Sequence, residues 1–244
     1  AVGRAFGRED AGPVGLVIWT TTPWTLPANL MIAVHPEFEY RLVRMNGKQH
    51  VVAAELLETV AGAIGADGVE ELATAHGRDL VGLEYRHPFC DRTGRVVEAE
   101  YVTLEDGTGL VHTAPGHGQE DFETGRREGV EAYSPVRDDG TYDDTVPEWL
   151  RGVSVWDAND MIIAHLRESG HMLHDHRFWH SYAHDWRSKT PVIFRCTEQW
   201  FVAVDQPTRR EDRSLRSMAQ EAATSKIHFV PGWGRNRMAG MLES

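Results

Sequence analysis

Residues 107–122, GTGLVHTAPGHGQEDF, constrain the fold of this chain more than any other stretch. A turn with two glycines leads into Leu110 and Val111, which have the pattern of a buried strand beginning. Polar residues and a Pro-Gly turn end that strand. A helix is then expected from Gln119, and Gly129 ends it. The stretch therefore predicts a strand, a loop and a helix N-terminus in close succession.

Three polar side chains of this stretch are expected to converge. His112 lies at the strand end, His117 in the loop and Asp121 in the first helical turn. The free N–H groups of a first helical turn favour the ionised form of an acid there. Such an arrangement is more typical of an active-site loop than of a packing element.

The rest of the chain predicts strands with helices between them. Asn46-Gly47 is the strongest hairpin signal and joins strands expected over 38–45 and 49–53. Further strands are expected over 14–19, from 31, and over 80–85, 96–104, 172–179, 192–204 and 227–230. Helices are expected over 54–64, from a cap at Asp157 or Asn159 to Leu166, over 212–223 and after Trp233. Without internal repeats, this pattern predicts a mainly β fold with interspersed helices (α+β) and a β-barrel-like core.

Two segments are expected to lack regular structure. In 19–29, WTTTPWTLPAN, two prolines disfavour helix and strand. Its threonine hydroxyls either cap nearby backbone groups or line a site; taken alone, the segment favours capping. Residues 134–150 are acidic and rich in turn residues, which predicts a solvated connection.

Composition excludes several classes of protein. A net charge of -12 argues against a general nucleic-acid-binding surface, which is normally basic. Neither a membrane-spanning run nor a signal peptide is recognised, so we expect a cytoplasmic protein without a membrane partner. Cys90 and Cys196 form no CxxC pair and are expected to be reduced thiols.

Three segments together carry a family resemblance: residues 19–29, residues 107–122 and residues 189–205, KTPVIFRCTEQWFVAVD. They resemble the inserted editing (CP1) domain of isoleucyl-tRNA synthetases, over nearly the whole chain. The related valine and leucine enzymes carry an Arg-Pro with an acid where this chain has Thr22-Pro23-Trp24-Thr25. The resemblance is therefore specific to the isoleucine family.

The resemblance implies an editing domain over 1–205, followed by a segment over 206–244 that leads back to a catalytic domain outside this sequence. The HIGH-type and KMSKS-type signatures of aminoacylation are absent from the sequence. We therefore expect no synthetic activity and no cofactor in this fragment, ATP and Mg²⁺ being used by the parent enzyme. Its implied partners are the tRNA(Ile) 3′ end carrying valine and the remaining domains of the parent.

The implied reaction is hydrolysis of valyl-tRNA(Ile), with valyl-adenylate as a second candidate substrate. By resemblance, Asp121 holds the α-ammonium and His112 limits side-chain length. Thr20, Thr21 and Thr22 are expected to orient the ester, the ribose and an attacking water, since no activated nucleophile is recognised. The expected substrate-binding residues are Trp24, Thr25, Asn29, Gly116, His117 and Tyr182.

Two other functions remain open on the residues alone. His112, His117 and Asp121 could form a metal-dependent hydrolase, although their spacing matches no recognised ligand signature. Alternatively, the chain could dock tRNA without catalysis. Some relatives carry half of a zinc site where this chain has Asp185 and Ser188, so we predict no metal.

Overall fold

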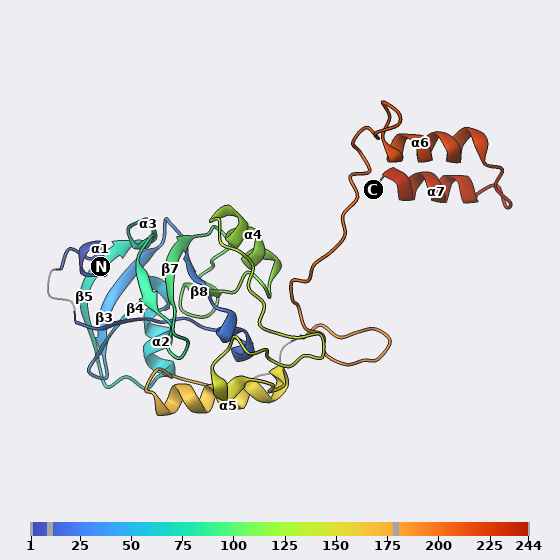
Figure 1. The fold of residues 1–244 in the computed structure, drawn as a ribbon. Helices are drawn as coiled ribbons and strands as arrows, with labels where there is room; N and C mark the ends of the chain where they lie inside the picture. The colour runs from blue at the N-terminus through green and yellow to red at the C-terminus, as the bar shows by residue number, and fades with distance from the viewer. Residues whose placement is uncertain (1, 9–11, 178–180, 244) are drawn as a thin grey trace. The chain divides into compact units, whose positions relative to one another are not determined.

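The computed structural model describes residues 2–8, 12–177 and 181–243, and the chain divides into two compact units, residues 1–196 and 197–244 (Figure 1). The expected division at 205/206 between an editing domain and a C-terminal segment remains a prediction. The first unit contains all the described strands and the helical segments that surround them: α1 (Val2–Ala5), η1 (Pro23–Ala28), α2 (Leu57–Ala63), α3 (Gly77–Leu80), α4 (Gln119–Arg127) and α5 (Val155–Glu168). Short 3₁₀ turns, η2 (Ala54–Leu56) and η3 (Glu148–Leu150), complete it.

The described strands form two four-stranded sheets. The first has the order β1 (Val14–Leu16), β4 (Lys48–Ala53), β3 (Glu39–Met45) and β5 (Val69–His76), with β1 parallel to β4 and the other pairs antiparallel. The second has the order β6 (Glu84–Arg86), β7 (Thr93–Glu98), β2 (Met31–Val34) and β8 (Leu110–Thr113), with β2 parallel to β7. The expected α+β mixture is confirmed, and the described strands do not close into a barrel.

The hairpin between β3 and β4 is confirmed. Asn46 and Gly47 both have positive φ, 48° and 77°, as a two-residue hairpin turn that matches strand twist requires. The helix expected over 54–64 is also confirmed, and Gly65 follows it with a φ of 60°.

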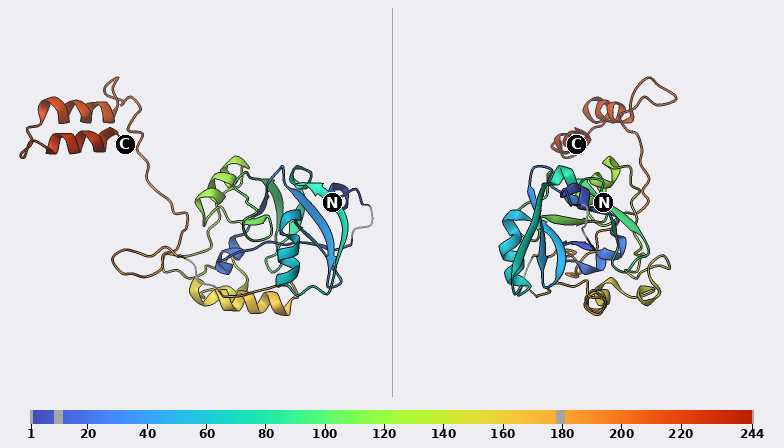
Figure 2. Two further views of the ribbon diagram at one scale, coloured as in Figure 1. Left: turned by 180° about the vertical axis from the view of Figure 1, so that it is seen from behind. Right: turned by 90° about the vertical axis from the view of Figure 1, so that its left-hand side faces the viewer.

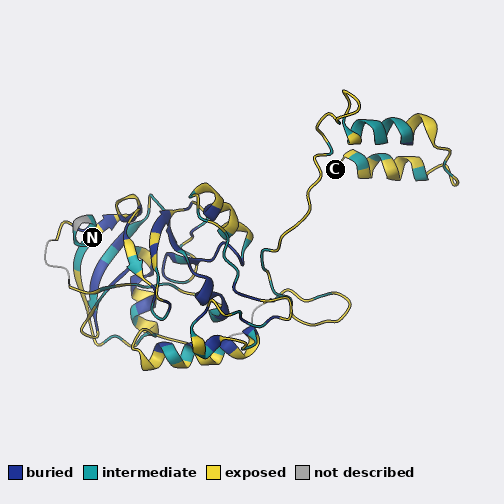
Figure 3. Ribbon diagram, in the orientation of Figure 1, coloured by how far each residue is buried: buried dark blue, intermediate teal, exposed yellow. Residues whose placement is uncertain are grey.

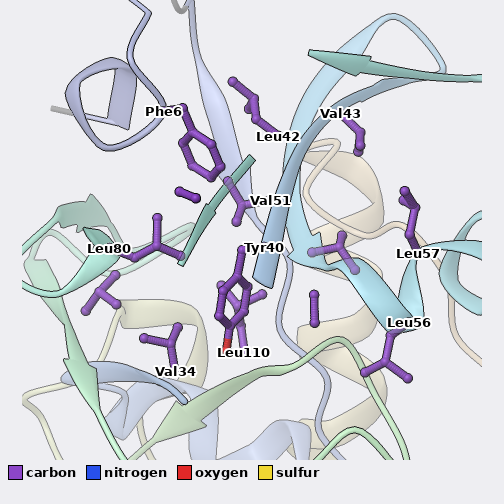
Figure 4. Packing of buried hydrophobic residues seen from close by; sticks show 14 of the residues in the cluster. Phe6, Val34, Tyr40, Leu42, Val43, Val51, Leu56, Leu57, Leu80 and Leu110 are labelled. Carbon is purple, nitrogen blue, oxygen red and sulfur yellow. The ribbon is translucent and has the colours of Figure 1, made fainter. Parts of the chain in front are cut away.

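The two sheets pack against each other through one apolar cluster that draws on both (Figure 4). Tyr40 is fully buried in it, close to Val34 and Leu110 of the second sheet (Figure 4). Its hydroxyl donates to the carbonyl of Gly109 at 2.8 Å, and so anchors the turn that precedes β8. Figure 3 shows this buried interior running through the strands, with the exposed faces of the helices outside it.

A second cluster lies between η1, residues 136–155 and α5. Helices α4 and α5 lie at opposite ends of the first unit in both Figure 1 and Figure 2. Helix α5 is capped by Ser154, whose hydroxyl accepts from the N–H of Trp156 at 3.3 Å, so the expected caps are wrong. Asn159 instead accepts from the N–H of Trp24 at 3.0 Å and ties α5 to η1.

Several expectations about local structure are wrong. The segment 19–29 contains the 3₁₀ helix η1, because Pro23 occupies its first turn, where the missing N–H costs nothing. Residues 134–150 are not merely a solvated connection, since Val136, Tyr142, Val146 and Leu150 are buried under α5. Strand β5 was not expected, and its mostly exposed residues explain why the pattern missed it.

No described residue of 172–177, 192–204 or 227–230 belongs to a strand; residues 178–180 lie outside the described part. Residues 200–204, WFVAV, form an apolar run as in a buried strand, yet Trp200 and Phe201 are both more than nine-tenths exposed. An apolar pattern forms a strand only where a second strand supplies partners for its N–H and C=O groups, and no described residue of 192–204 is paired in this way. Strands expected over 80–85 and 96–104 are displaced to β6 and β7.

The second unit is a pair of helices, α6 (Leu215–Glu221), continued by a π-helical turn over Ala222–Lys226, and α7 (Gly234–Glu243). Both expected helices are confirmed. Arg216 joins the unit by donating to the carbonyl of Leu242 at 2.7 Å and by an ion pair with Asp205. Ala223 is its one buried hydrophobic residue among those described, and Figure 3 shows α6 mostly of intermediate burial and α7 largely exposed.

Candidate active site

One cavity of about 370 Å³ opens where residues 19–22 before η1, strand β8 and the start of α4 meet. A parallel bridge between Trp19 and Val111 holds the segment before η1 against β8. Seven of the predicted site residues line the cavity: Thr20, Thr21, Thr22, Thr25, His112, His117 and Asp121. The structure thus brings together the segments 19–29 and 107–122, which are remote in sequence.

Asp121 lies in the first turn of α4, as predicted. Its Oδ2 accepts a hydrogen bond from the N–H of Ala114 at 2.8 Å. Burial raises the pKa of Asp121 to about 6, against the lowering effect of that N–H, and the charge of Glu120 raises it further. We expected the helix N-terminus to favour the ionised form, but burial has the larger effect. The carboxyl is therefore ionised at neutral pH and protonated in mild acid.

His112 is buried on β8, and both of its ring nitrogens are hydrogen-bonded. Nε2 lies 2.8 Å from Oγ1 of Thr25, and Nδ1 lies 2.8 Å from Nδ2 of Asn29. Burial lowers the pKa of His112 to about 3, so the ring is neutral at physiological pH. A neutral ring held at both nitrogens forms a rigid part of the cavity wall.

His117 is held in the turn before α4. Its Nδ1 donates to the carbonyl of Phe194 at 2.9 Å, and its ring meets Trp24 edge to face at a centroid distance of 5.1 Å. Nε2 is buried and has no hydrogen-bond partner among the described residues. Burial lowers the pKa of His117, which keeps this ring neutral as well.

The threonines form a local hydrogen-bonded group at the start of η1. The N–H of Thr22 donates to Oγ1 of Thr20 at 3.1 Å, and Oγ1 of Thr25 donates to the carbonyl of Thr22 at 2.9 Å. Thr21 is exposed, whereas Thr20 and Thr22 are half-buried. The hydroxyls both cap backbone groups and line the cavity, and that the cavity is a catalytic site remains a prediction.

The other predicted site residues lie behind the cavity wall or away from it. Trp24 is buried in the second core cluster. Truncating such a side chain lowers the free energy of unfolding by about 3–5 kcal/mol, so a Trp24 variant would report on stability before it reported on substrate binding. Asn29 supports His112 from behind. A Cβ on Gly116 would lie 2.2 Å from the carbonyl oxygen of Tyr133, so this glycine allows close backbone packing. Tyr182 donates to the carbonyl of Val192 at 3.2 Å.

Sequence reasoning missed part of the cavity lining. Asp106 and Glu120 line it. Glu120 lies within residues 107–122 and Asp106 directly precedes them, so their negative charge could have identified them as candidates. Tyr101 and Thr103 also line it, and no local pattern distinguishes them. Among the described lining residues there are three acids and neither Lys nor Arg. The cavity therefore favours a cationic group over a phosphate.

The geometry does not favour the metal alternative. Both nitrogens of His112 and Nδ1 of His117 are engaged in hydrogen bonds, which leaves only Nε2 of His117 and the Asp121 carboxylate as donors. The described residues hold no group of three His, Cys, Asp or Glu placed to bind an ion. That this domain uses no metal remains a prediction.

Cys90 and Cys196 are both free thiols.

No family model matches the chain, but it aligns with isoleucine–tRNA ligases. It is 48% identical over 228 residues to the enzyme of Persephonella marina, covering 93% of this chain and 24% of that protein. It is 49% identical over 234 residues to the enzyme of Nitratidesulfovibrio vulgaris, an alignment that covers 96% of this chain and 24% of that protein. It is 46% identical to the enzyme of Aquifex pyrophilus, with 93% of this chain and 45% of that protein aligned. The chain thus spans about a quarter of the first two relatives.

Two solved structures share the fold. The crystal structure of GlLeuRS-CP1 has a TM-score of 0.57 at 16% identity and covers 69% of this chain and 87% of its own. The editing domain of Plasmodium falciparum cytosolic leucyl-tRNA synthetase has a TM-score of 0.52 at 12% identity and covers 67% and 80%. The chain therefore has the fold of these leucyl-tRNA synthetase editing domains. The chain belongs to the isoleucine–tRNA ligase family and corresponds to an internal domain of those longer proteins.

Among the described residues, no helix combines the length and apolarity needed to cross a membrane.

Proposed function

We propose that this domain is an aminoacyl-tRNA deacylase that hydrolyses valyl-tRNA(Ile) and rejects isoleucine by size. One observation carries the proposal: a single cavity holds an acid with a raised pKa, a rigid histidine wall and a group of threonine hydroxyls. An amino acid ester needs a partner for its ammonium, a limit on its side chain and an oriented water, and these residues supply all three.

The need for such a domain follows from the small difference between valine and isoleucine. One methylene in an apolar pocket is worth about 1–3 kcal/mol, a general range for which isoleucyl-tRNA synthetases are themselves a standard example. A second pocket that admits valine and excludes isoleucine increases the discrimination. In this proposal Asp121 pairs with the ammonium, and His112 blocks the extra methylene.

The hydrolytic step is direct attack by water on the ester carbonyl. Thr20, Thr21 and Thr22 orient the water and the ester with their hydroxyl and backbone groups. The water oxygen bonds to the carbonyl carbon, the ester C–O bond breaks, and the water proton goes to the leaving ribose oxygen. The products are free valine and tRNA, and no cofactor of this domain takes part. ATP and Mg²⁺ would serve the catalytic domain of the cytoplasmic parent enzyme.

Single-turnover deacylation of valyl-tRNA(Ile) and isoleucyl-tRNA(Ile) tests this function. We expect the valyl ester to be hydrolysed, the isoleucyl ester to be spared, and thorough chelation to change neither rate. Activity that is lost with the metal would support the metal-dependent hydrolase instead. Binding of tRNA without hydrolysis of either ester would support the docking module.

The pKa of Asp121 predicts how binding depends on pH. Because the ionised carboxylate pairs with an ammonium, the affinity for a hydrolysis-resistant valyl-adenosine should fall about twofold from pH 7 to pH 6 and approach a tenfold fall per pH unit below about pH 5. Calorimetric titration between pH 4.5 and 7 measures this. Asp106→Asn, which removes another lining acid, should keep the same transition. A flat affinity from pH 5 to 7 in the wild type would contradict the ammonium assignment.

The net charge predicts weak and only slightly salt-dependent binding of whole tRNA. A chain of net charge -12 is expected to hold only the 3′ end, and each phosphate contact contributes a salt slope of about 0.9. We therefore expect a short valylated 3′-end mimic to be hydrolysed nearly as fast as full valyl-tRNA(Ile). A salt series on both substrates measures this. A strong preference for whole tRNA with a steep salt slope would reveal a basic surface formed on folding.

A further inference from the structure

A chain of hydrogen bonds runs from outside the cavity to its wall. The hydroxyl of Tyr85 donates to Oδ1 of Asn29 at 2.5 Å, and Nδ2 of Asn29 donates to Nδ1 of His112 at 2.8 Å. Nε2 of His112 then donates to Oγ1 of Thr25 at 2.8 Å, which donates to the carbonyl of Thr22 at 2.9 Å. Tyr85 itself does not line the cavity.

The direction of every bond in this chain follows from its first donor. Burial raises the pKa of Tyr85, so its hydroxyl stays protonated and donates. Asn29 must then present its oxygen to Tyr85 and its NH₂ group to His112, and the carbonyl of Met31, 2.8 Å from Nδ2, favours the same orientation. Nδ1 of His112 is consequently the acceptor, and the ring hydrogen lies on Nε2.

Tyr85 is itself held by a close packing contact. It pairs with Gly94 across β6 and β7, and its ring lies over that glycine. A Cβ on Gly94 would lie 2.3 Å from Cζ and from the hydroxyl oxygen of Tyr85. Any larger residue at that position would displace the ring and its hydroxyl from Asn29.

We propose that Tyr85 is a positioning residue that fixes the tautomer and the place of His112, and so sets the size limit of the cavity. This rests on the proposed function, because the size limit matters only to a site that selects valine over isoleucine. Without the hydroxyl, Oδ1 of Asn29 is left buried without a donor, and an unsatisfied buried group costs about 1–3 kcal/mol. The amide moves to find a partner, and the ring of His112 moves with it.

Tyr85→Phe tests the proposal with two measurements. The rate of isoleucyl-tRNA(Ile) hydrolysis relative to valyl-tRNA(Ile) should rise about threefold to tenfold, because the wall is less rigid. The ¹⁵N resonances of His112, which in the wild type should show hydrogen on Nε2 alone, should shift toward the average of the two tautomers. Gly94→Ala should reproduce both changes, since it displaces the same ring.

Tyr133→Phe is the matched control, because it removes a tyrosine hydroxyl that bonds to Oγ1 of Thr145, outside both the cavity lining and this chain of hydrogen bonds. It should leave both the selectivity and the His112 resonances unchanged. Unchanged His112 resonances in Tyr85→Phe would overturn the positioning role even if the domain hydrolysed no ester at all. Shifted resonances with unchanged selectivity would overturn the link between Tyr85 and the size limit.

Discussion

Asp121→Ala is expected to reduce single-turnover hydrolysis of valyl-tRNA(Ile) by about 100-fold or more. Removing one partner of a buried charge pair costs about 2–5 kcal/mol, and each 1.4 kcal/mol is tenfold in a rate or an equilibrium constant. Among the three acids of the lining, Asp121 is half-buried and the other two are exposed, and burial raises the pKa of Asp121. The ammonium therefore loses the interaction that also aligns the ester with the threonines.

Asp121→Asn separates the lost charge from lost structure. It keeps the size of the side chain and an oxygen for the N–H of Ala114, yet we expect similar harm to hydrolysis. The raised pKa means that ionisation of Asp121 destabilises the fold as pH rises from about 4 to about 6. The melting temperature of Asp121→Asn should therefore be higher than that of the wild type at pH 7.5, and the two melting temperatures should be equal near pH 4. Wild-type hydrolysis rates in either variant would refute the ammonium assignment.

His112→Ala is expected to make the domain hydrolyse isoleucyl-tRNA(Ile). The imidazole is buried in the wall and fixed at both nitrogens, so deleting it leaves space where the longer side chain was blocked. Discrimination between the two esters should fall by about tenfold or more, in line with the value of one methylene. Single-turnover rates on both esters measure the change.

The direction of that change distinguishes two roles for His112. A variant that loses activity on valine and gains none on isoleucine would show a catalytic role instead of a size limit. Thr25→Val serves as a control, because it removes the partner of Nε2 without enlarging the cavity by a ring. It should weaken selectivity less than His112→Ala does.

The parts of the fold that depend on neighbouring residues were predictable from the sequence. Asn46-Gly47 specifies its turn by positive φ at both positions, and the strand, turn and helix of 107–122 follow from local signals. Most of the cavity lining comes from two segments, 19–29 and 107–122, whose composition is unusual in the sequence itself. Local sequence signals are sufficient to predict structure where residues close in the sequence determine it.

Contacts between residues that are far apart in the sequence could not be predicted. The burial of Tyr142 under α5 and the anchoring of Trp24 by Asn159 depend on how remote segments meet. The same holds for Tyr85, whose hydrogen bond to Asn29 joins residues far apart in the chain. The strand expected over 192–204 failed for the opposite reason, since its apolar pattern finds no partner strand among the described residues.

The most direct test of the proposed editing site is a structure of this domain with a hydrolysis-resistant valyl-adenosine. We predict that the ammonium lies within hydrogen-bond distance of the Asp121 carboxylate, with the valine side chain directed at the ring of His112. The threonines at the start of η1 should face the ester position. An ammonium bound elsewhere, or a side chain directed away from His112, would contradict the proposed roles of both residues.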